Sequence, residues 1–127
     1  MKRQNVSGGA PWETIVGYSR AVKINNVIEV SGTTATENGE IKCKGDLAGQ
    51  TRFILEKISA ALAKCGVSMT DVVRTRIYVT DISKWEEAGR VHGEFFKDIL
   101  PATSMVEVSK LIDPEILVEI EATAILG

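Results

Sequence analysis

The chain is poor in the residues from which small proteins build metal sites and disulfide frameworks. Its 127 residues include one histidine, two cysteines and three prolines, and aromatic residues make up only 6%. Cys43 and Cys65 lie outside any CxxC pattern, and one pair cannot form a disulfide framework, so we expect no disulfide scaffold and no zinc site. Cys65 falls on the apolar stripe of a predicted helix, which indicates a buried structural thiol.

Long hydrophobic runs and an excess of one charge are also missing. No stretch approaches the roughly 20 apolar residues that a membrane helix requires, and the opening residues MKRQNVSGGAPWET hold no run of signal-peptide length. The formal net charge is −2, with lysine and arginine scattered along the chain. We therefore expect a cytoplasmic protein that contacts no membrane, and the composition does not favour nucleic acid as a partner.

Motifs for phosphate binding and nucleophilic catalysis are absent as well. The glycine pair in Ser7-Gly8-Gly9-Ala10 lacks the lysine and the helix that follow a phosphate-binding loop. There is no G-x-S-x-G elbow, and no spacing suggests a Cys/His pair. No metal and no cofactor are expected.

What is present is the composition of a globular protein, with 44% hydrophobic and 25% charged residues. No repeat or linker divides the chain, so residues 1–127 are predicted to form a single domain. Periodicity and turn residues predict two strands within 22–31, a loop or small irregular hairpin over 33–45, a helix over 46–66, a strand over 72–80, a helix over 83–99, and strands over 104–109 and 117–125.

Local residues mark where these elements begin and end. Asn25-Asn26 suits the positive φ angles of a tight hairpin turn. Asp46 is a good N-cap for the first helix, and Gly66 is placed to end it. Ser83 with Glu86 predicts a capping box for the second helix. The resulting ββαβαββ order favours an α+β sandwich, with two helices on one face of a mixed sheet.

Alternation along the strands predicts two chemically different sheet faces. The apolar sets belong under the helices: Val73, Thr75, Ile77, Val79, Val118, Ile120, Ala122 and Ala124. The other face would carry Arg74, Arg76, Tyr78, Glu119, Glu121 and Thr123, with Leu117 and Ile125. This polar face is either a solvated surface with cross-strand Arg–Glu pairs or a contact with other subunits. We favour association, because the face is more apolar than a free surface requires.

Two further residues attract attention as candidates. His92 is the only histidine, and its spacing from Trp85 and Phe95 places it on the core-facing stripe of the second helix, so we predict a buried, hydrogen-bonded core residue. Trp12, beside Glu13 in an N-terminal arm, is predicted to anchor that arm to the body, and such an arm also suits covering the mouth of a cleft.

The segment from Leu100 to Leu126, LPATSMVEVSKLIDPEILVEIEATAIL, is the most specific motif. It resembles the closing segment of the RidA (YjgF-like) family, P-A-R-S-x-V-E-V followed by V/I-E-I-E-A, and the resemblance extends from Gly17 through Ala122. It implies a chorismate-mutase-like fold, a homotrimeric barrel, and clefts between subunits that take a small metabolite. Family members are best known as hydrolases that deaminate reactive imines and enamines.

The same resemblance assigns candidate site residues. Glu119 matches the glutamate that positions the attacking water, and Tyr18 matches a tyrosine that lines the cleft. Thr103 stands where the family has an arginine that grips the substrate carboxylate, which places this chain in a subgroup lacking that arginine. Arg20 or Arg76 is a candidate replacement cation, or else the ligand is not a carboxylate.

Three functions stay open from the sequence. The first is hydrolytic deamination of a small imine or enamine, and the second is a non-catalytic trimer that binds a metabolite or regulates through the same clefts. The third is the older family description, translation inhibition by an L-PSP-type endoribonuclease. The acidic balance of the chain does not favour this third reading.

Overall fold

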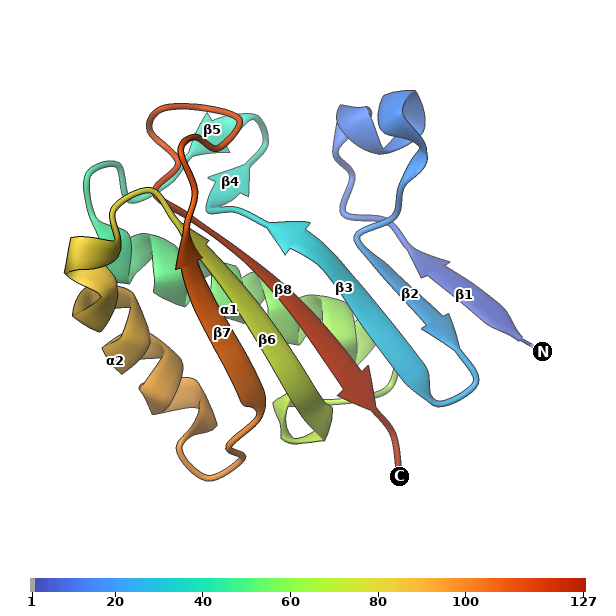
Figure 1. The fold of residues 1–127 in the computed structure, drawn as a ribbon. Coiled ribbons are helices and arrows are strands. Elements are labelled where there is room, and N and C mark those ends of the chain that lie inside the picture. Colours follow the sequence, from blue (N-terminus) through green and yellow to red (C-terminus); the bar gives the residue numbers. More distant parts are fainter. Residues whose placement is uncertain (1) are drawn as a thin grey trace.

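The computed structural model describes residues 2–127 and contains a six-stranded sheet in the order β1-β2-β3-β8-β6-β7 (Figure 1). Neighbouring strands are antiparallel except β6 and β7, which are parallel. The main elements are β1 (Arg3–Val6), β2 (Ala21–Ile24), β3 (Val27–Thr33), α1 (Leu47–Lys64), β6 (Val72–Val79), α2 (Trp85–Phe96), β7 (Ala102–Glu107) and β8 (Val118–Ile125). No helix in this described part is long and apolar enough to cross a membrane.

Shorter elements connect these. A small hairpin pairs β4 (Thr36–Glu37) with β5 (Glu40–Ile41), which is one of the two alternatives, loop or small hairpin, predicted for this region. A π-helical turn, η1 (Glu13–Gly17), precedes β2, and single 3₁₀ turns precede β6 and α2. The predicted ββαβαββ order is therefore confirmed from Ala21 onward, and β1 and the small hairpin are added to it.

Several predicted local features are confirmed. Asn25 has φ 55°, as predicted for the tight turn between β2 and β3, whereas Asn26, for which a positive φ was also predicted, is not among the described residues that have one. The Asp46 side chain accepts a hydrogen bond from the Gly49 backbone N–H at 2.9 Å and caps α1. Gly66 has φ 76°, in the left-handed region that terminates a helix.

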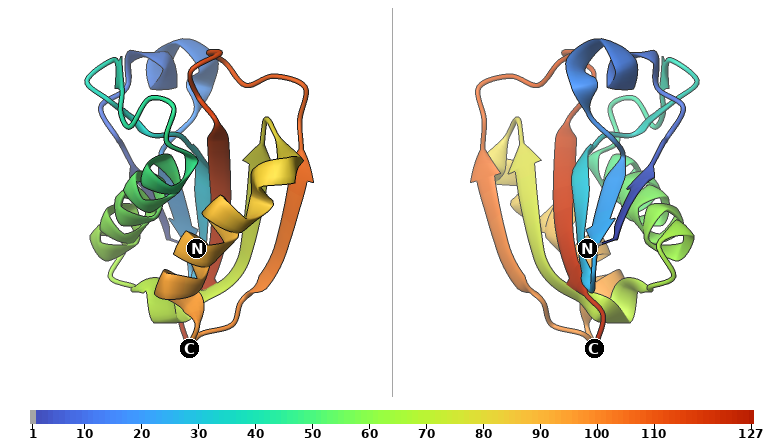
Figure 2. Two further views of the ribbon diagram at one scale, coloured as in Figure 1. Left: turned by 90° about the vertical axis from the view of Figure 1, so that its left-hand side faces the viewer. Right: turned by 90° about the vertical axis from the view of Figure 1, so that its right-hand side faces the viewer.

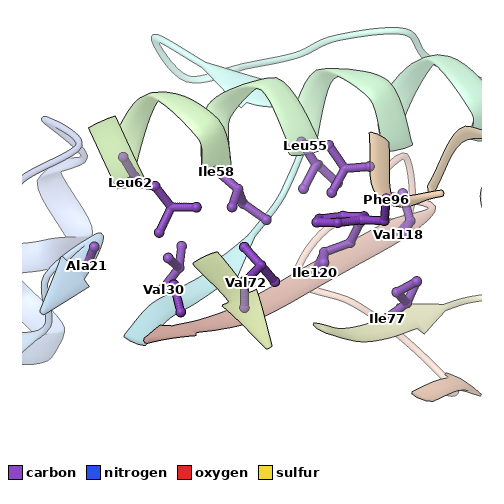
Figure 3. Close-up of a cluster of buried hydrophobic side chains, with 14 of the residues drawn as sticks. Ala21, Val30, Leu55, Ile58, Leu62, Val72, Ile77, Phe96, Val118 and Ile120 are labelled. Atoms are coloured by element: carbon purple, nitrogen blue, oxygen red, sulfur yellow. The ribbon is translucent and has the colours of Figure 1, made fainter. Parts of the chain in front are cut away.

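Both helices lie on the same side of the twisted sheet and bury its apolar side chains (Figure 2). In Figure 3, Leu55, Ile58 and Leu62 of α1 and Phe96 of α2 lie above labelled side chains of β2, β3, β6 and β8. The alternation of β8 is confirmed, because its residues 118, 120, 122 and 124 are at most 1% exposed. Cys65 is buried as predicted, and burial raises the pKa of its thiol.

The prediction for the start of β6 is wrong. Val73 is 43% exposed and Val72 is buried instead. The pairing of β6 with β8 shifts register between Val72 and Arg74, and such an irregularity changes which residue faces the core. From Thr75 onward the predicted alternation holds.

The predicted start of α2 is also wrong. Asp81 caps a 3₁₀ turn that precedes α2, and its carboxylate accepts hydrogen bonds from the Ser83 N–H at 3.0 Å and the Ser83 hydroxyl at 2.6 Å. Ser83 therefore belongs to this 3₁₀ turn, and α2 begins only at Trp85 without a side-chain cap. Trp85 is exposed rather than core-facing, while the buried residues of α2 are Ala88, Val91 and Phe96.

The N-terminal segment also differs from expectation. Residues Arg3–Val6 form the edge strand β1, paired with β2, rather than a loose arm. Trp12 is 57% exposed, so it does not anchor the segment to the body of its own chain. Its neighbours in η1, Ile15 and Val16, are exposed as well. In Figure 1 this turn stands beyond the ends of β1 and β2, away from both helices.

Candidate functional site

A cluster of polar side chains occupies the sheet face opposite the helices, which we call the open face, near the end of β3. The pairing of β3 with β8 shifts register between Val30 and Thr33, so Ser31 and Gly32 leave the regular ladder. Irregularities of this kind re-aim side chains and are frequent beside active sites. Here the irregularity lies between Arg20, which follows η1, and Glu119 on β8.

Arg20 is held firmly in this cluster. Its Nη1 donates to the carbonyl oxygen of Gly32 at 2.6 Å and to Oγ1 of Thr33 at 3.0 Å. Its Nη2 lies 3.5 Å from the Tyr18 hydroxyl, and the guanidinium carbon is 5.6 Å from the centre of the Tyr18 ring. Tyr18 and Arg20 therefore form one unit, in which a cation lies against an aromatic ring.

Glu119 lies next to this unit, in space that a missing side chain leaves open. A Cβ atom on Gly32 would stand 2.6 Å from Glu119 Oε2, which is closer than real contacts allow. Within residues 2–127 the Glu119 carboxylate accepts no hydrogen bond from protein. Burial raises the pKa of Glu119, the charge of Glu121 raises it further, and the Arg20 charge opposes both. A partly buried carboxylate of this kind is suited to proton transfer.

Glu13 fixes the segment that delivers Tyr18. Glu13 is 8% exposed, and its carboxylate accepts hydrogen bonds from the backbone N–H groups of Gly8 at 2.9 Å and Ala10 at 3.2 Å. Burial works to raise the pKa of Glu13, but these hydrogen bonds and the Arg20 charge outweigh it and lower the pKa. The Glu13 carbonyl also accepts from the Tyr18 N–H at 3.0 Å, which sets the end of η1.

An open hollow of about 390 Å³ adjoins the cluster. Tyr18, Glu13 and Gly17 form one wall, and side chains of β1, β2 and β3 on the open face form the floor. Glu119 does not line this hollow but lies beyond Ser31 and Gly32. In the single chain, Tyr18 therefore lines a broad depression, and Glu119 lies on the adjoining part of the open face.

The basic residues of β6 do not form the ion pairs that a solvated face would predict. Arg76 is opposite Glu121 in the register, yet no ion pair among the described residues joins the β6 arginines to the β8 glutamates. Instead, the Tyr78 hydroxyl donates to Glu121 at 2.6 Å, and this hydrogen bond raises the pKa of Tyr78. Arg74 donates to Ser104 Oγ at 2.8 Å, and its buried Nε has no partner in the described chain.

Thr103 lies apart from this cluster within one chain. It is opposite Thr75 in the parallel pairing of β6 and β7, and the two hydroxyl oxygens are 2.8 Å apart. Thr75 is fully buried, and its hydroxyl is also 2.9 Å from His92 Nε2. The Thr103 hydroxyl therefore points to the helix-covered side of the sheet. His92 is partly buried and hydrogen-bonded, and burial lowers its pKa.

The structure thus brings together three of the five predicted site residues, Tyr18, Arg20 and Glu119. Arg76 shares the open face with Glu119, two strand positions away, and Thr103 is on the opposite side. Sequence reasoning did not find Gly32 or the role of Glu13. An isolated glycine within the strand pattern of β3 was the available indication of a bulge and a close approach.

These elements define a chorismate-mutase-like α+β fold with a candidate site around the Glu119 carboxylate on the open sheet face. A family model described as Endoribonuclease L-PSP matches residues 9–126. The chain therefore belongs to the YjgF/RidA family, as its C-terminal motif indicated.

Individual relatives support this assignment. A RutC family protein of Pyrococcus abyssi, PYRAB12510, is 39% identical over 109 residues, 84% of each chain. The 3-aminoacrylate deaminase RutC of Acinetobacter baylyi is 35% identical over 108 residues, 84% of this chain and 85% of that protein. The crystal structure of Rv2704 from Mycobacterium tuberculosis, a YjgF/YER057c/UK114 family member, has a TM-score of 0.90 and 51% identity, covering 98% of this chain and all of that one.

Proposed function

We propose that this chain forms a homotrimer whose open sheet faces meet, with clefts between subunits that take a small metabolite. The open face carries apolar side chains that residues 2–127 leave exposed: Val27 is 39%, Ile125 42% and Val106 47% exposed. Exposed apolar groups of this kind, on a sheet that the helices cover from one side only, favour burial by symmetric association.

In these clefts the protein hydrolytically deaminates a small imine or enamine. The observation that carries this proposal is Glu119, a partly buried carboxylate with a raised pKa, no hydrogen bond from any of residues 2–127, and an arginine beside it. A carboxylate placed in this way can receive and return protons during the addition of water. The deaminase name of the Acinetobacter relative agrees with this reaction class.

Hydrolysis of the imine needs two proton relays through one carboxylate, each an acceptance followed by a return. An enamine first becomes the imine by gaining a proton at carbon and losing one at nitrogen. Water then adds its oxygen to the imine carbon, and Glu119 accepts the water proton and gives it to nitrogen. Next, Glu119 removes the hydroxyl proton and passes it to nitrogen, so the C=O bond forms, the C–N bond breaks and ammonia leaves. Imine and water thus become carbonyl compound and ammonia.

The remaining residues shape the cleft. Tyr18 presents a rigid aromatic wall, which Arg20 holds in place through its contacts with β3. Arg76 is an exposed cation on the same face, where it can meet a polar group of the ligand. Thr103, on the edge strand β7, would reach a cleft only where a second subunit approaches that edge.

A second candidate is a non-catalytic trimer that binds a metabolite or regulates, and one observation favours it. The side chain at position 103 is an uncharged threonine, so β7 offers no charged anchor there. The Thr103 hydroxyl is also already hydrogen-bonded with Thr75 and with the Pro101 carbonyl oxygen, the latter at 3.2 Å. RNA cleavage is not proposed, because the open face mixes acidic and basic side chains rather than forming a continuous basic surface.

Ammonia release tests the enzymatic proposal. The substrates are freshly generated 2-aminoacrylate and 3-aminocrotonamide, a primary enamine without a carboxylate. Turnover of either is expected to fall about 10²- to 10⁴-fold in Glu119→Ala, the range for loss of a general base. Glu56→Ala, on the exposed side of α1, is the control and should keep full activity. No turnover by the folded wild-type protein would favour the binding trimer.

A further inference from the structure

Two arginines of β6 are neighbours on the open face, and neither is paired with a carboxylate of the described chain. Arg74 and Arg76 are two positions apart, so their side chains leave the same face of the strand roughly 7 Å from each other. Arg76 is exposed and makes no hydrogen bond or ion pair within residues 2–127. Arg74 donates from Nη2 to Ser104 Oγ at 2.8 Å, while its buried Nε has no acceptor there. Most donors of these two guanidinium groups are therefore uncommitted.

The carboxylate that faces Arg76 across the strands is engaged elsewhere. Glu121 is opposite Arg76 in the pairing of β6 with β8, yet it accepts a 2.6 Å hydrogen bond from the Tyr78 hydroxyl. Tyr78 lies one side-chain repeat further along β6, so this bond draws Glu121 away from Arg76. Arg76 is therefore not held on the β8 side and can turn toward β7.

The edge strand β7 brings a hydroxyl and no acid to the two arginines. Its residues on the open face are Ala102, Ser104 and Val106. Glu107, the one acid of β7, lies on the alternate face and accepts from the 3₁₀ turn before α2. Ser104 is opposite Arg76 and accepts from Arg74, so the Arg74 guanidinium reaches toward Arg76. Both cations therefore meet at the border of β6 and β7, beside a hydroxyl that can still donate its own hydrogen.

A neighbouring subunit would approach this border in the proposed trimer. A ring of three equivalent chains uses heterologous contacts, so the β7 edge of one sheet would meet the β1 side of the next. The hollow on the β1 side presents Arg3 and neutral polar side chains, and its one carboxylate, Glu13, is 8% exposed and bound by two backbone N–H groups. On the adjoining β3, Glu29 accepts from the Thr123 hydroxyl of its own chain at 2.6 Å. This surface therefore offers the arginines no unengaged carboxylate.

The donors at this border suit a phosphate group better than a carboxylate. A carboxylate presents two oxygens in one plane, and a single guanidinium can satisfy both of them. Two guanidinium groups and a hydroxyl donate from several directions, which matches the non-planar oxygens of a phosphate. The phosphate charge of about −1.5 to −2 at neutral pH also matches two cations that have no counter-charge beside them in the described chain.

We propose that Arg74, Arg76 and Ser104 form a binding site for phosphate or for the phosphate group of a small ligand. The site is separate from the reacting carboxylate, and it rests on the trimer of the proposed function only where the neighbouring subunit is concerned. Glu119 is opposite Tyr78, so Arg76 is its diagonal neighbour, at a Cβ separation of about 7–8 Å. A bound phosphate would therefore adjoin the Glu119 cleft without occupying it.

Calorimetric titration of the assembled protein with inorganic phosphate and with methyl phosphate tests this site. We expect saturable binding at one site per chain, and acetate should bind at least about tenfold more weakly because it satisfies fewer donors. Tighter binding of methyl phosphate would identify a phosphate ester as the ligand, and tighter binding of inorganic phosphate the free ion. Absence of saturable binding of both, or equal binding of acetate, would overturn the proposal.

Substitutions of the arginines test which groups hold the anion. Arg76→Gln should weaken phosphate binding at least about tenfold, the range for loss of a hydrogen bond between charged groups. Arg76→Lys keeps the charge but not the planar fork, so its affinity should fall between those of the wild type and Arg76→Gln. Arg90→Gln removes an exposed arginine from α2 and is the matched control, with unchanged affinity. Equal affinities of Arg76→Gln and Arg90→Gln would contradict the assignment.

The inner arginine and the hydroxyl are tested separately. Arg74→Gln should weaken binding about as much as Arg76→Gln, and Ser104→Ala roughly two- to fivefold, since a single hydrogen bond to a hydroxyl is lost. Arg74 is partly buried, so a urea midpoint accompanies its variant, while the result for the exposed Arg76 stands without it. Full affinity in a folded Arg74→Gln protein would show that two arginines are not required.

Sedimentation velocity and ammonia release separate this site from the proposed function. If the wild type binds no phosphate and Arg76→Gln breaks the assembly, the arginines serve subunit contact and the proposal is wrong. Phosphate binding by a protein that releases no ammonia would keep the site and remove the catalytic role of Glu119. Ammonia release without phosphate binding would keep the catalytic role and remove the site.

Discussion

On β8, Val118, Ile120 and Ala122 pack under the helices, whereas Glu119 and Glu121, on the same strand, face the open side of the sheet. The helix-covered face is apolar and closely packed, and even its buried Thr75 has hydrogen-bond partners. Among the described residues, the open face keeps the Glu119 carboxylate and the buried Nε of Arg74 without hydrogen-bond partners, together with exposed apolar residues. The covered face therefore holds most of the packing that stabilises the chain, while the open face keeps polar and apolar groups whose contacts are not made within residues 2–127.

The largest expected effect is a loss of folding stability caused by a substitution on the helix-covered face. Ile120→Ala should lower the free energy of unfolding by about 2–5 kcal/mol, because it leaves a cavity in a fully buried core. Ile125→Ala, on the open face of the same strand, should change it far less but weaken association. Urea unfolding at fixed subunit concentration and sedimentation velocity measure the two. Equal losses of stability would contradict the contrast between the faces.

The next effect concerns the open face. Gly32→Ala places a methyl group against the Glu119 carboxylate, so we expect activity to fall roughly 10- to 100-fold through misplacement of the reacting group. Gly93→Ala in α2 is the matched control, because a Cβ there meets nothing within 4 Å. Ammonia release and a urea midpoint for each variant give the result. Unchanged activity in a folded Gly32→Ala protein would show that the close approach is not needed.

A smaller effect follows from the ionisation of Glu119. Because its pKa is raised above the ordinary 4.5, the folded state holds a proton that the unfolded chain has already released. Stability from this group is therefore lost as pH rises through the folded pKa. Glu119→Gln should have a higher urea midpoint than the wild type near neutral pH, and the difference should shrink in acid. A constant difference across pH would sink this interpretation.

The smallest effect lies on the covered face. Burial lowers the pKa of His92 below 6.5, so the unfolded chain binds a proton before the folded one does, and stability falls as pH drops through this range. His92→Gln keeps a hydrogen-bonding group for Thr75 but does not titrate. The wild type should therefore lose more stability than His92→Gln between about pH 7.5 and 5.5. Parallel losses in urea unfolding would show that His92 does not contribute.

Sequence reasoning succeeded where local chemistry decides the outcome. The Asn25 turn, the Asp46 cap, the Gly66 helix end and the alternation of β8 each depend on residues close together in the chain. The prediction of the α2 cap failed because Asp81 precedes Ser83 and offers the 3₁₀ turn a better acceptor. The prediction that Val73 faces the core failed because its orientation depends on a register shift against β8, which no local pattern of β6 reveals.

The sequence by itself determined the family, the two helices, and which residues of β8 face the core, since period-two and helical patterns follow from backbone geometry. Only the tertiary structure decided that Arg20 is tied to Gly32 and Thr33, that Glu119 occupies the space beside a glycine, and that Thr103 turns toward Thr75. These contacts join residues up to 87 positions apart, for Gly32 and Glu119. Their geometry depends on strand order, register and a bulge, so it exists only once the sheet has formed.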